Sequence, residues 1–454
     1  MPQQTTGARV ASFRPLKRAM VSMLAIGLGL PGAALAGTYR VGSGTEDGAL
    51  PTVEAALSAA KGDAAAKILL PEGVFHLPAA FRPLDGMTIR GVGEKTTVIG
   101  TIVMADARKV TISDLTLAGA VEGQPAASAR AMDVVDSSDI TLTRVRITGY
   151  TQGAIRLERV ARATIDECVF VRTTTNSYQL DGKTPASQST AILLGDIEDV
   201  RILRTLIDTR VPGGRGIGSC KESWSADTPW ADPPTAMTRL EIGHCTILVD
   251  QWHAWNVPGT NTHPPQMTIE LWHTAPDSVE IHHNYLNNTV SLSSDRSAGK
   301  PLAARTVHMH HNRIELIPTG REYRYAVEPY VSRFEFDHNY VIRGVYPFAT
   351  WGKQGKWEDQ KIHHNVFYAT GPAHALMNHL AEMPGLLFAH NTVYLTDRQR
   401  TALATFAAGD GRNLNQRVVN NLFISTVEQD QPLGFTLNVD HKGSNESAPW
   451  ENTR

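Results

Sequence analysis

The sequence predicts an all-β protein built as a solenoid, in which short strands stack into about twelve coils. Three observations lead to this fold class. A short apolar pattern recurs from residue 89 onward at intervals of 23–40 residues, the segments between its copies lack helical periodicity, and one turn position carries asparagine in six successive copies. Strands with period-two alternation that return at such intervals are typical of repeat proteins, in which each unit packs on its neighbours.

Each copy of the pattern starts with an apolar anchor, continues with two polar residues and a turn residue, and has a second apolar residue five positions after the anchor. The eleven anchors are Ile112, Leu142, Ile165, Ile202, Ile242, Ile281, Met309, Phe336, Ile362, Phe388 and Val418. The second position is apolar in all eleven copies, although only 42 % of the whole chain is apolar. The pattern therefore indicates a strand that bends sharply and buries a side chain on each side of the bend.

The turn position predicts a ladder of side-chain amides. Asparagine tolerates left-handed turns, and its amide can bond from one coil to the next. The six residues of this asparagine ladder are Asn284, Asn312, Asn339, Asn365, Asn391 and Asn421. Earlier copies place Cys168, Thr205 and Cys245 there, so the two cysteines lie two coils apart. At the spacing of adjacent strands this is about 10 Å, beyond disulfide reach, and we expect free thiols at both and at Cys220.

The N-terminus has the features of a secretory signal peptide. Arg14, Lys17 and Arg18 precede a short apolar run, and Ala34 and Ala36 form a small-x-small cleavage site. We expect a signal peptide at 1–36, a coil domain at 37–425 and a C-terminal capping tail at 426–454. A secreted or periplasmic location follows from this interpretation.

Composition excludes several classes of protein. An apolar fraction of 42 %, a charged fraction of 19 % and a net charge of −2 indicate a folded chain rather than a disordered one. The absence of a basic excess argues against a nucleic-acid partner. Three cysteines are too few for a disulfide scaffold.

The start of the chain adds a family resemblance. Residues 52–61 suit an amphipathic capping helix, residues 67–75 a first strand and turn, and residues 86–91 a first coil. Together with the repeat, these segments resemble the right-handed parallel β-helix proteins of the pectin-lyase-like superfamily over roughly residues 38–425. The resemblance implies a right-handed parallel β-helix with an N-terminal capping helix. It also implies a polysaccharide or oligosaccharide bound along the sheet whose strands precede the anchors.

Long turns and tryptophans mark the expected groove. The three longest anchor intervals, of 37, 40 and 39 residues, are adjacent, and five of the eight tryptophans lie between residues 224 and 272. Flat aromatic rings stack on sugar faces, although the same rings could instead form a small core that holds the loops. The predicted substrate-binding residues are Trp252, Trp255, Trp272, His273 and Arg321.

Strand alternation selects the side chains that face the groove. With Ile269 and Leu271 inside, Glu270 and Trp272 point outward, and Glu328 follows two coils later if Val327 points inward. The predicted catalytic residues are His253, Glu270, Tyr323, Arg324 and Glu328.

Two chemistries compete for these residues. A uronate lyase neutralises a carboxylate, abstracts the C5 proton and protonates the leaving oxygen, which suits His253, Tyr323 and Arg324. A glycoside hydrolase uses two carboxylates, such as Glu270 and Glu328, or Glu270 with Glu222 or Asp250 as a closer partner. We favour the polysaccharide lyase; the glycoside hydrolase, a uronate C5-epimerase and a non-catalytic glycan- or metal-binding periplasmic protein remain alternatives. The segment 214–219 is nearest to the G-H-G motif of polygalacturonases, with arginine at the histidine position.

Histidines repeat as regularly as the asparagines. One turn slot holds His244, His283, His311, His338, His364 and His390, and the slot before it holds His282, His310, Asp337 and His363. Imidazole is a common metal ligand, but stacked coils repeat their turn residues, so we favour a structural ladder. We predict no cofactor, keep calcium as an alternative, and expect a monomer without nucleic-acid or membrane partners after signal cleavage.

Overall fold

A computed structural model provides the structure of the chain, which divides into two units, Met1–Leu35 and Ala36–Arg454. The described residues all belong to the second unit. They are 37–42, 48–78, 81–119, 130–171, 173, 190–210, 214–219, 234–249, 267–294, 306–316, 325–342, 346–350, 357–369, 377–379, 383–396, 404–407, 417–428, 435–438 and 445–446.

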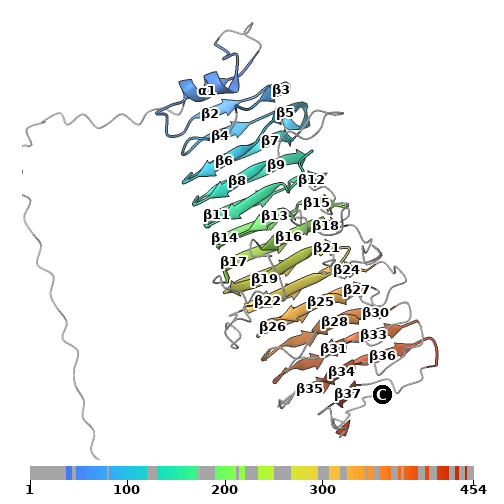
Figure 1. The fold of residues 1–454 in the computed structure, drawn as a ribbon. Coiled ribbons are helices and arrows are strands. Elements are labelled where there is room, and N and C mark those ends of the chain that lie inside the picture. The colour runs from blue at the N-terminus through green and yellow to red at the C-terminus, as the bar shows by residue number, and fades with distance from the viewer. Residues whose placement is uncertain are drawn as a thin grey trace, which may run out of the picture. The chain divides into compact units, whose positions relative to one another are not determined.

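The described chain begins with a strand and a helix. β1 (Thr38–Arg40) pairs in parallel with β2 (Lys67–Leu69). Between them lies α1 (Val53–Ala59), whose first turn is capped by Thr52, because the Thr52 Oγ1 accepts a hydrogen bond from the Ala55 N–H at 3.1 Å. α1 buries Val53 and Ala56 and lies next to β2 at the start of the stack (Figure 1). The predicted N-terminal capping helix is confirmed.

Backbone pairing arranges nearly all the remaining strands in three parallel series, which we name sheets A, B and C and which are connected with one another. Figure 1 shows the strands stacked coil upon coil. Sheet A consists of β6 (Ile102–Ala105), β8 (Met132–Val135), β10 (Ile155–Glu158), β13 (Thr190–Leu194), β16 (Arg215–Ser219), β19 (Ile269–Pro276), β22 (Val290–Ser294), β25 (Tyr325–Tyr330), β28 (Tyr346–Thr350), β31 (Met377–His379), β34 (Ala404–Ala407) and β37 (Phe435–Asn438). β38 (Asn445–Glu446) pairs with β37 in the antiparallel sense.

Sheet B carries the anchors. After β2 it consists of β4 (Thr88–Arg90), β7 (Thr111–Ala118), β9 (Ile140–Thr148), β11 (Val160–Asp166), β14 (Ile197–Leu203), β17 (Thr235–Gly243), β20 (Ser278–His282), β23 (Thr306–His310), β26 (Phe334–Asp337), β29 (Lys361–His363), β32 (Leu387–Ala389) and β35 (Arg417–Val419).

Sheet C follows the turn in each coil. It starts with β3 (Gly73–His76) and β5 (Thr96–Ile99), and a 3₁₀ turn, η1 (Gly93–Lys95), precedes β5. The later halves of β7 and β9 come next. It continues with β12 (Val169–Val171), β15 (Leu206–Thr209), β18 (Thr246–Val249), β21 (Tyr285–Leu286), β24 (Arg313–Glu315), β27 (Tyr340–Ile342), β30 (Val366–Ala369), β33 (Thr392–Leu395) and β36 (Leu422–Ser425).

All eleven predicted anchors stand in register. Backbone pairing joins each anchor to the next, from Ile112 with Leu142 to Phe388 with Val418. The second apolar positions form a matching column on sheet C, and nearly all members of both columns belong to one hydrophobic core. Among the described residues listed above, α1 is the one α-helix. No helix in this part of the chain is long and apolar enough to span a membrane. The predicted fold class, an all-β parallel β-helix, is confirmed.

The asparagine ladder is present, with one correction to its geometry. In Asn339, the Nδ2 donates to the Met309 carbonyl at 2.9 Å and to the Asn365 Oδ1 at 3.1 Å. Its Oδ1 accepts from the N–H and the Nδ2 of Asn312, each at 2.9 Å. The left-handed backbone belongs to the residue before each asparagine, for example His338 with φ 53°. The asparagine itself therefore points its amide into the stack instead of making the turn.

The cysteine predictions hold for the two described residues. Cys168 and Cys245 are free and buried, and Thr205 occupies the equivalent position in the coil between them. The N–H of Cys245 donates to the Asn284 Oδ1 at 2.8 Å, so the ladder ends on a cysteine backbone. Cys220 lies outside the described residues.

Candidate active site

Sheet A aligns the two predicted carboxylates in one column. Backbone pairing places Glu270 of β19 beside Ser291 of β22, and Ser291 beside Glu328 of β25. The two glutamates therefore lie two strands apart, or about 10 Å. Ile269, Leu271 and Val327 belong to the hydrophobic core. Because side chains alternate along a strand, the column lies on the outer face of the sheet, as predicted.

The side chains of the column are buried, whereas the sequence led us to expect side chains that line an open groove. Glu270 is 6 % exposed, Glu328 is 3 % exposed and Ser291 is fully buried. Buried charged and polar groups need partners that replace water. The neighbouring strands supply such partners for each of the three side chains.

Arg215, at the start of β16, neutralises Glu270. Its Nη1 lies 2.5 Å from the Glu270 Oε2, and the two side chains are 4 % and 8 % exposed. Breaking such a pair would leave a charge in a poorly solvated place, so each residue depends on the other. The Glu270 carboxylate is therefore buried in an ion pair with Arg215 and is not exposed to solvent.

Ser291 joins Glu328 to Trp272. The Ser291 Oγ donates to the Glu328 Oε2 at 2.7 Å and accepts from the Trp272 Nε1–H at 2.8 Å. The Trp272 ring meets the Tyr330 ring edge-on, with centroids 6.3 Å apart. Trp272 is only partly buried, so part of its surface stays accessible beside the buried carboxylates.

Backbone contacts fix the strand that carries Glu270 and Trp272. The Ser219 Oγ donates to the Trp272 carbonyl at 2.7 Å and accepts from the Trp272 N–H at 3.1 Å. The pairing of β19 with β22 shifts between Leu271 and Thr274. His273 lies in this irregularity with φ 50° and is 2 % exposed. Its predicted contact with substrate stays a prediction, and its present position is that of a buried bulge residue.

Several predicted residues lie outside the described residues, and their roles stay predictions. These are the catalytic candidates His253, Tyr323 and Arg324, and the substrate-binding candidates Trp252, Trp255 and Arg321. The described part of the site therefore consists of the floor formed by sheet A.

Two residues of this floor were missed by the sequence analysis. Arg215 stands in the segment compared with the G-H-G motif, but nothing in the sequence pairs it with a glutamate 55 positions later. Ser291 has no distinctive sequence context, although its place in the outward column follows from the strand register. Aligning the outward positions of successive coils would have brought out the order Gly218, Glu270, Ser291, Glu328.

A separate cleft of about 460 Å³ lies on the first coils. It is lined by Arg90, Gly91 and Asp114, among others. Arg90 is already paired with Asp114 at 3.1 Å, and Arg144 approaches the same carboxylate at 2.6 Å. The Arg144 side chain holds the pKa of Asp114 below its usual value, although partial burial opposes this shift. The cleft lies several coils away from the predicted groove. Two of the charged side chains that line it, Arg90 and Asp114, are already paired with each other.

Comparisons with known proteins bear on the fold. No family model and no curated protein matches the chain. Among solved structures, the chain is similar to PfbA, a surface adhesin of Streptococcus pneumoniae, at 14 % identity and a TM-score of 0.50, covering 85 % of this chain and 87 % of that one.

Two enzymes show a weaker likeness. A mannuronic acid specific polysaccharide family 6 lyase from human gut microbiota has 14 % identity and a TM-score of 0.46, over 85 % of this chain and 82 % of that one. A family 28 exopolygalacturonase of Yersinia enterocolitica has 8 % identity and a TM-score of 0.39, over 88 % and 79 %. At these identities the likeness concerns the fold alone.

Proposed function

We propose that this chain is an exported carbohydrate-active protein that cleaves a uronate-containing polysaccharide by β-elimination. In this proposal residues 1–36 are a signal peptide, residues 37–425 form the β-helix domain and residues 426–454 cap its C-terminal end. The protein acts as a monomer outside the cytoplasm, in the medium or the periplasm. The substrate lies along the outer face of sheet A.

The observation that carries the proposal is the column on sheet A. Its side chains Glu270, Ser291 and Glu328 are polar or charged, lie outside the hydrophobic core and, like the Glu270 partner Arg215, are nearly inaccessible to solvent. A stacking repeat does not require this arrangement, because neighbouring coils place different residues there. Buried charges held in fixed orientation beside an accessible indole ring are typical of a site that recognises a polar ligand.

The elimination needs three groups. One neutralises the uronate carboxylate, one removes the C5 proton, and one protonates the glycosidic oxygen as the C4–O bond breaks and the C4=C5 double bond forms. Arg215 is engaged by Glu270, so the carboxylate partner has to be another cation, and we assign Arg324, with Arg321 as a second cation for substrate binding. A planar guanidinium suits a carboxylate. His253 and Tyr323 serve as base and acid. Trp252, Trp255 and Trp272 stack on sugar rings.

A glycoside hydrolase is the second candidate, favoured by the spacing of Glu270 and Glu328. Two strands separate them, about 10 Å, near the upper limit for an inverting pair. Against it, Glu270 is neutralised by Arg215 and Glu328 accepts a hydrogen bond from Ser291, and both are buried. A general acid must deliver a proton to the substrate, which neither environment favours.

Incubation with a panel of acidic and neutral polysaccharides tests the proposal. The expected result is a rise in ultraviolet absorbance from unsaturated uronates together with new reducing ends, on one or more uronate polymers. New reducing ends without the absorbance would replace the lyase by the hydrolase. No change in either signal on any polymer would contradict cleavage altogether.

Variants of the site separate the roles. Arg324→Ala and His253→Ala are expected to lower turnover by about a hundredfold or more, since each removes a group that acts in the reaction. Lys361→Ala is a matched control, because Lys361 is an exposed cation on sheet B. Loss of turnover in Glu270→Gln alone, with Arg324→Ala and His253→Ala fully active, would favour the hydrolase.

A further inference from the structure

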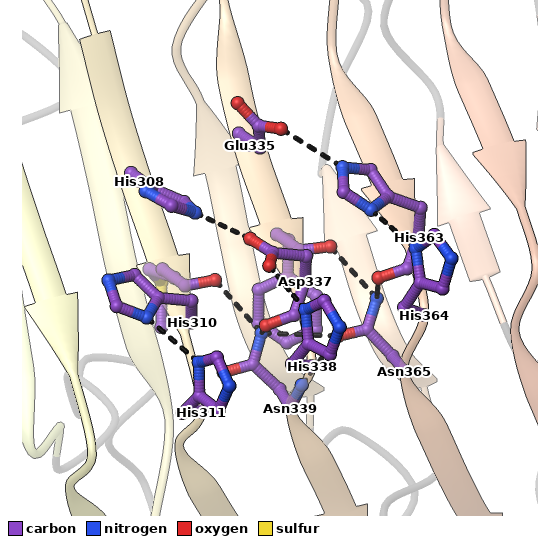
Figure 2. Close-up of polar contacts among 12 residues, drawn as sticks. His308, His310, His311, Glu335, Asp337, His338, Asn339, His363, His364 and Asn365 are labelled. Atoms are coloured by element: carbon purple, nitrogen blue, oxygen red, sulfur yellow. Dashed lines mark hydrogen bonds and ion pairs between the residues drawn. The ribbon is translucent and has the colours of Figure 1, made fainter.

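A second polar surface runs along the turns between sheets B and C, and Figure 2 shows part of it. Its outer row consists of the imidazoles of His244, His283, His311, His338, His364 and His390, which stack with ring centroids 4.8–5.2 Å apart. Desolvation and the neighbouring imidazoles lower the pKa of His283, His311 and His364, so these rings favour the neutral form. This confirms a stacked histidine ladder.

An inner row behaves differently. Each of its members pairs with a side chain of the preceding coil, two positions earlier in the repeat. The contacts are His282 with Glu241 at 3.4 Å, His310 with Glu280 at 3.1 Å, Asp337 with His308 at 2.5 Å and His363 with Glu335 at 3.0 Å. In the third contact the acid and the imidazole have exchanged places (Figure 2). The pairing of one acid with one imidazole is thus kept even where the residues swap.

The swap gives β23 a feature that its neighbours lack. His308 and His310 stand two positions apart on one strand and therefore on one face, with ring centroids 4.3 Å apart. The strands on either side carry one histidine and one carboxylate, or two carboxylates, at the same positions. Beside the two rings lies Glu280 of β20, and one ligand atom from each of the three residues lies within 4.8 Å of the others.

We infer that Glu280, His308 and His310 bind a divalent transition-metal ion, with zinc as the representative ion. Two imidazoles and one carboxylate form a donor set that suits zinc, whereas calcium and magnesium prefer oxygen ligands alone. In a tetrahedral zinc site with bonds near 2.0–2.1 Å, neighbouring donors lie about 3.3 Å apart. The Glu280 Oε1 and the His310 Nε2 are 3.1 Å apart, close to that separation.

Surrounding groups support the ligands. The Nδ1 of His310 lies 3.0 Å from the Nδ1 of His311, so the second nitrogen of one ligand is held by the outer row. Asp337 lies next to His308 and is itself held by the His338 Nδ1 at 2.6 Å. Such outer contacts orient imidazole ligands in metal sites. Glu280 and His308 are 45 % and 31 % exposed, which leaves room for an ion to enter and for water to complete its coordination.

Zinc titration of the full-length, tag-free protein tests this inference. After treatment with a chelator and removal of the chelator, calorimetry should find zinc bound at one site per chain with the highest affinity. His310→Gln is expected to lower that affinity by about tenfold or more, because it removes a ligand. Glu280→Gln should do the same and is the safer variant for folding, since Glu280 is the most exposed ligand.

His390→Gln is the matched control. His390 is an exposed member of the outer row and stacks on His364. It belongs neither to the proposed site nor to the two other groups of possible ligands among the described residues, which are His244 with His282 and His283, and Glu335 with Asp337 and His363. It should bind zinc like the wild type. The inference is overturned if the wild-type protein retains no zinc, or if His390→Gln lowers the affinity as much as Glu280→Gln does. The test is independent of polysaccharide cleavage, so its outcome and that of the proposed function can differ.

Discussion

The asparagine ladder and the column on sheet A are both rows of buried polar side chains, with one residue from each coil. The ladder repeats the same residue in six successive coils, and each of the first five amides donates to the next one. The column instead runs through Glu270, Ser291 and Glu328, and its contacts differ at every step.

This difference teaches how to separate stability from function in a repeat fold. A contact that stabilises stacking works equally well in every coil, so it can repeat without change. A site for a ligand has a defined place along the stack, so its residues differ from their neighbours above and below. By this criterion the sheet A column and the exchanged pair at His308 and Asp337 are the places where function is expected.

The largest predicted effect on stability falls on the column. Glu270→Gln removes the charge that neutralises buried Arg215, and we expect a loss of about 3–5 kcal/mol in the free energy of unfolding. Urea unfolding followed by circular dichroism measures it. The double variant Arg215→Met, Glu270→Leu should be less destabilised than Glu270→Gln. A Glu270→Gln protein as stable as the wild type would mean that the pair is not buried in solution.

The second prediction concerns the middle of the ladder. Asn339→Ala takes the acceptor away from two donors of Asn312 and the donor away from the Met309 carbonyl. We expect a loss of about 3 kcal/mol, since a buried group without a partner costs about 1–3 kcal/mol. Asn421→Ala, at the last rung, should cost less, because Asn421 is only partly buried. Equal effects at both positions would show that the rungs do not act as a ladder.

Ser291→Ala is expected to affect turnover more and stability less than Asn339→Ala does. Its hydrogen bonds to Glu328 and Trp272 are lost, at about 1–2 kcal/mol. Turnover should nevertheless fall more than in Asn339→Ala, because the orientation of Glu328 and Trp272 belongs to the proposed site. Unfolding midpoints and turnover at low temperature, measured on both variants, decide this. Full turnover in Ser291→Ala would remove the serine from the site.

The smallest predicted effect concerns the reactivity of Cys168 and Cys245, the two buried cysteines that precede the ladder. Burial raises the pKa of Cys168 to about 11 and that of Cys245 to about 12. Thiolates are the reactive form, so iodoacetamide should leave both residues unmodified in the folded protein across the neutral range. Both should react after unfolding in urea, as mass spectrometry of their peptides will show. Fast modification of either thiol in the folded protein would contradict its burial in the stack.

The sequence was sufficient for the fold because the repeat is redundant. If one anchor, such as Ile202, had been assigned wrongly, the ten other anchors would still have predicted the same fold. The asparagine ladder was predicted for the same reason, but its left-handed residue was misplaced by one position. The choice depends on where the amide finds its partners, and those in the neighbouring coils lie 26 to 42 positions away in the chain.

The site was predictable only in part. Alternation placed Glu270 and Glu328 on the outer face, because alternation is a local rule. The ion pair of Glu270 with Arg215 and the bridge through Ser291 depend on strands joined by intervals of unequal length. The burial of the column likewise depends on contacts between coils, and period-two alternation does not describe these.

The central claim is that the proposed substrate site along sheet A, to which we assign Arg324, and not the repeated ladder, carries the activity. Turnover of a uronate polysaccharide by Arg324→Ala and Asn339→Ala, at a temperature where both variants are folded, tests it most directly. The account predicts that Asn339→Ala keeps wild-type turnover and that Arg324→Ala loses about a hundredfold or more. Wild-type turnover in Arg324→Ala would contradict the claim.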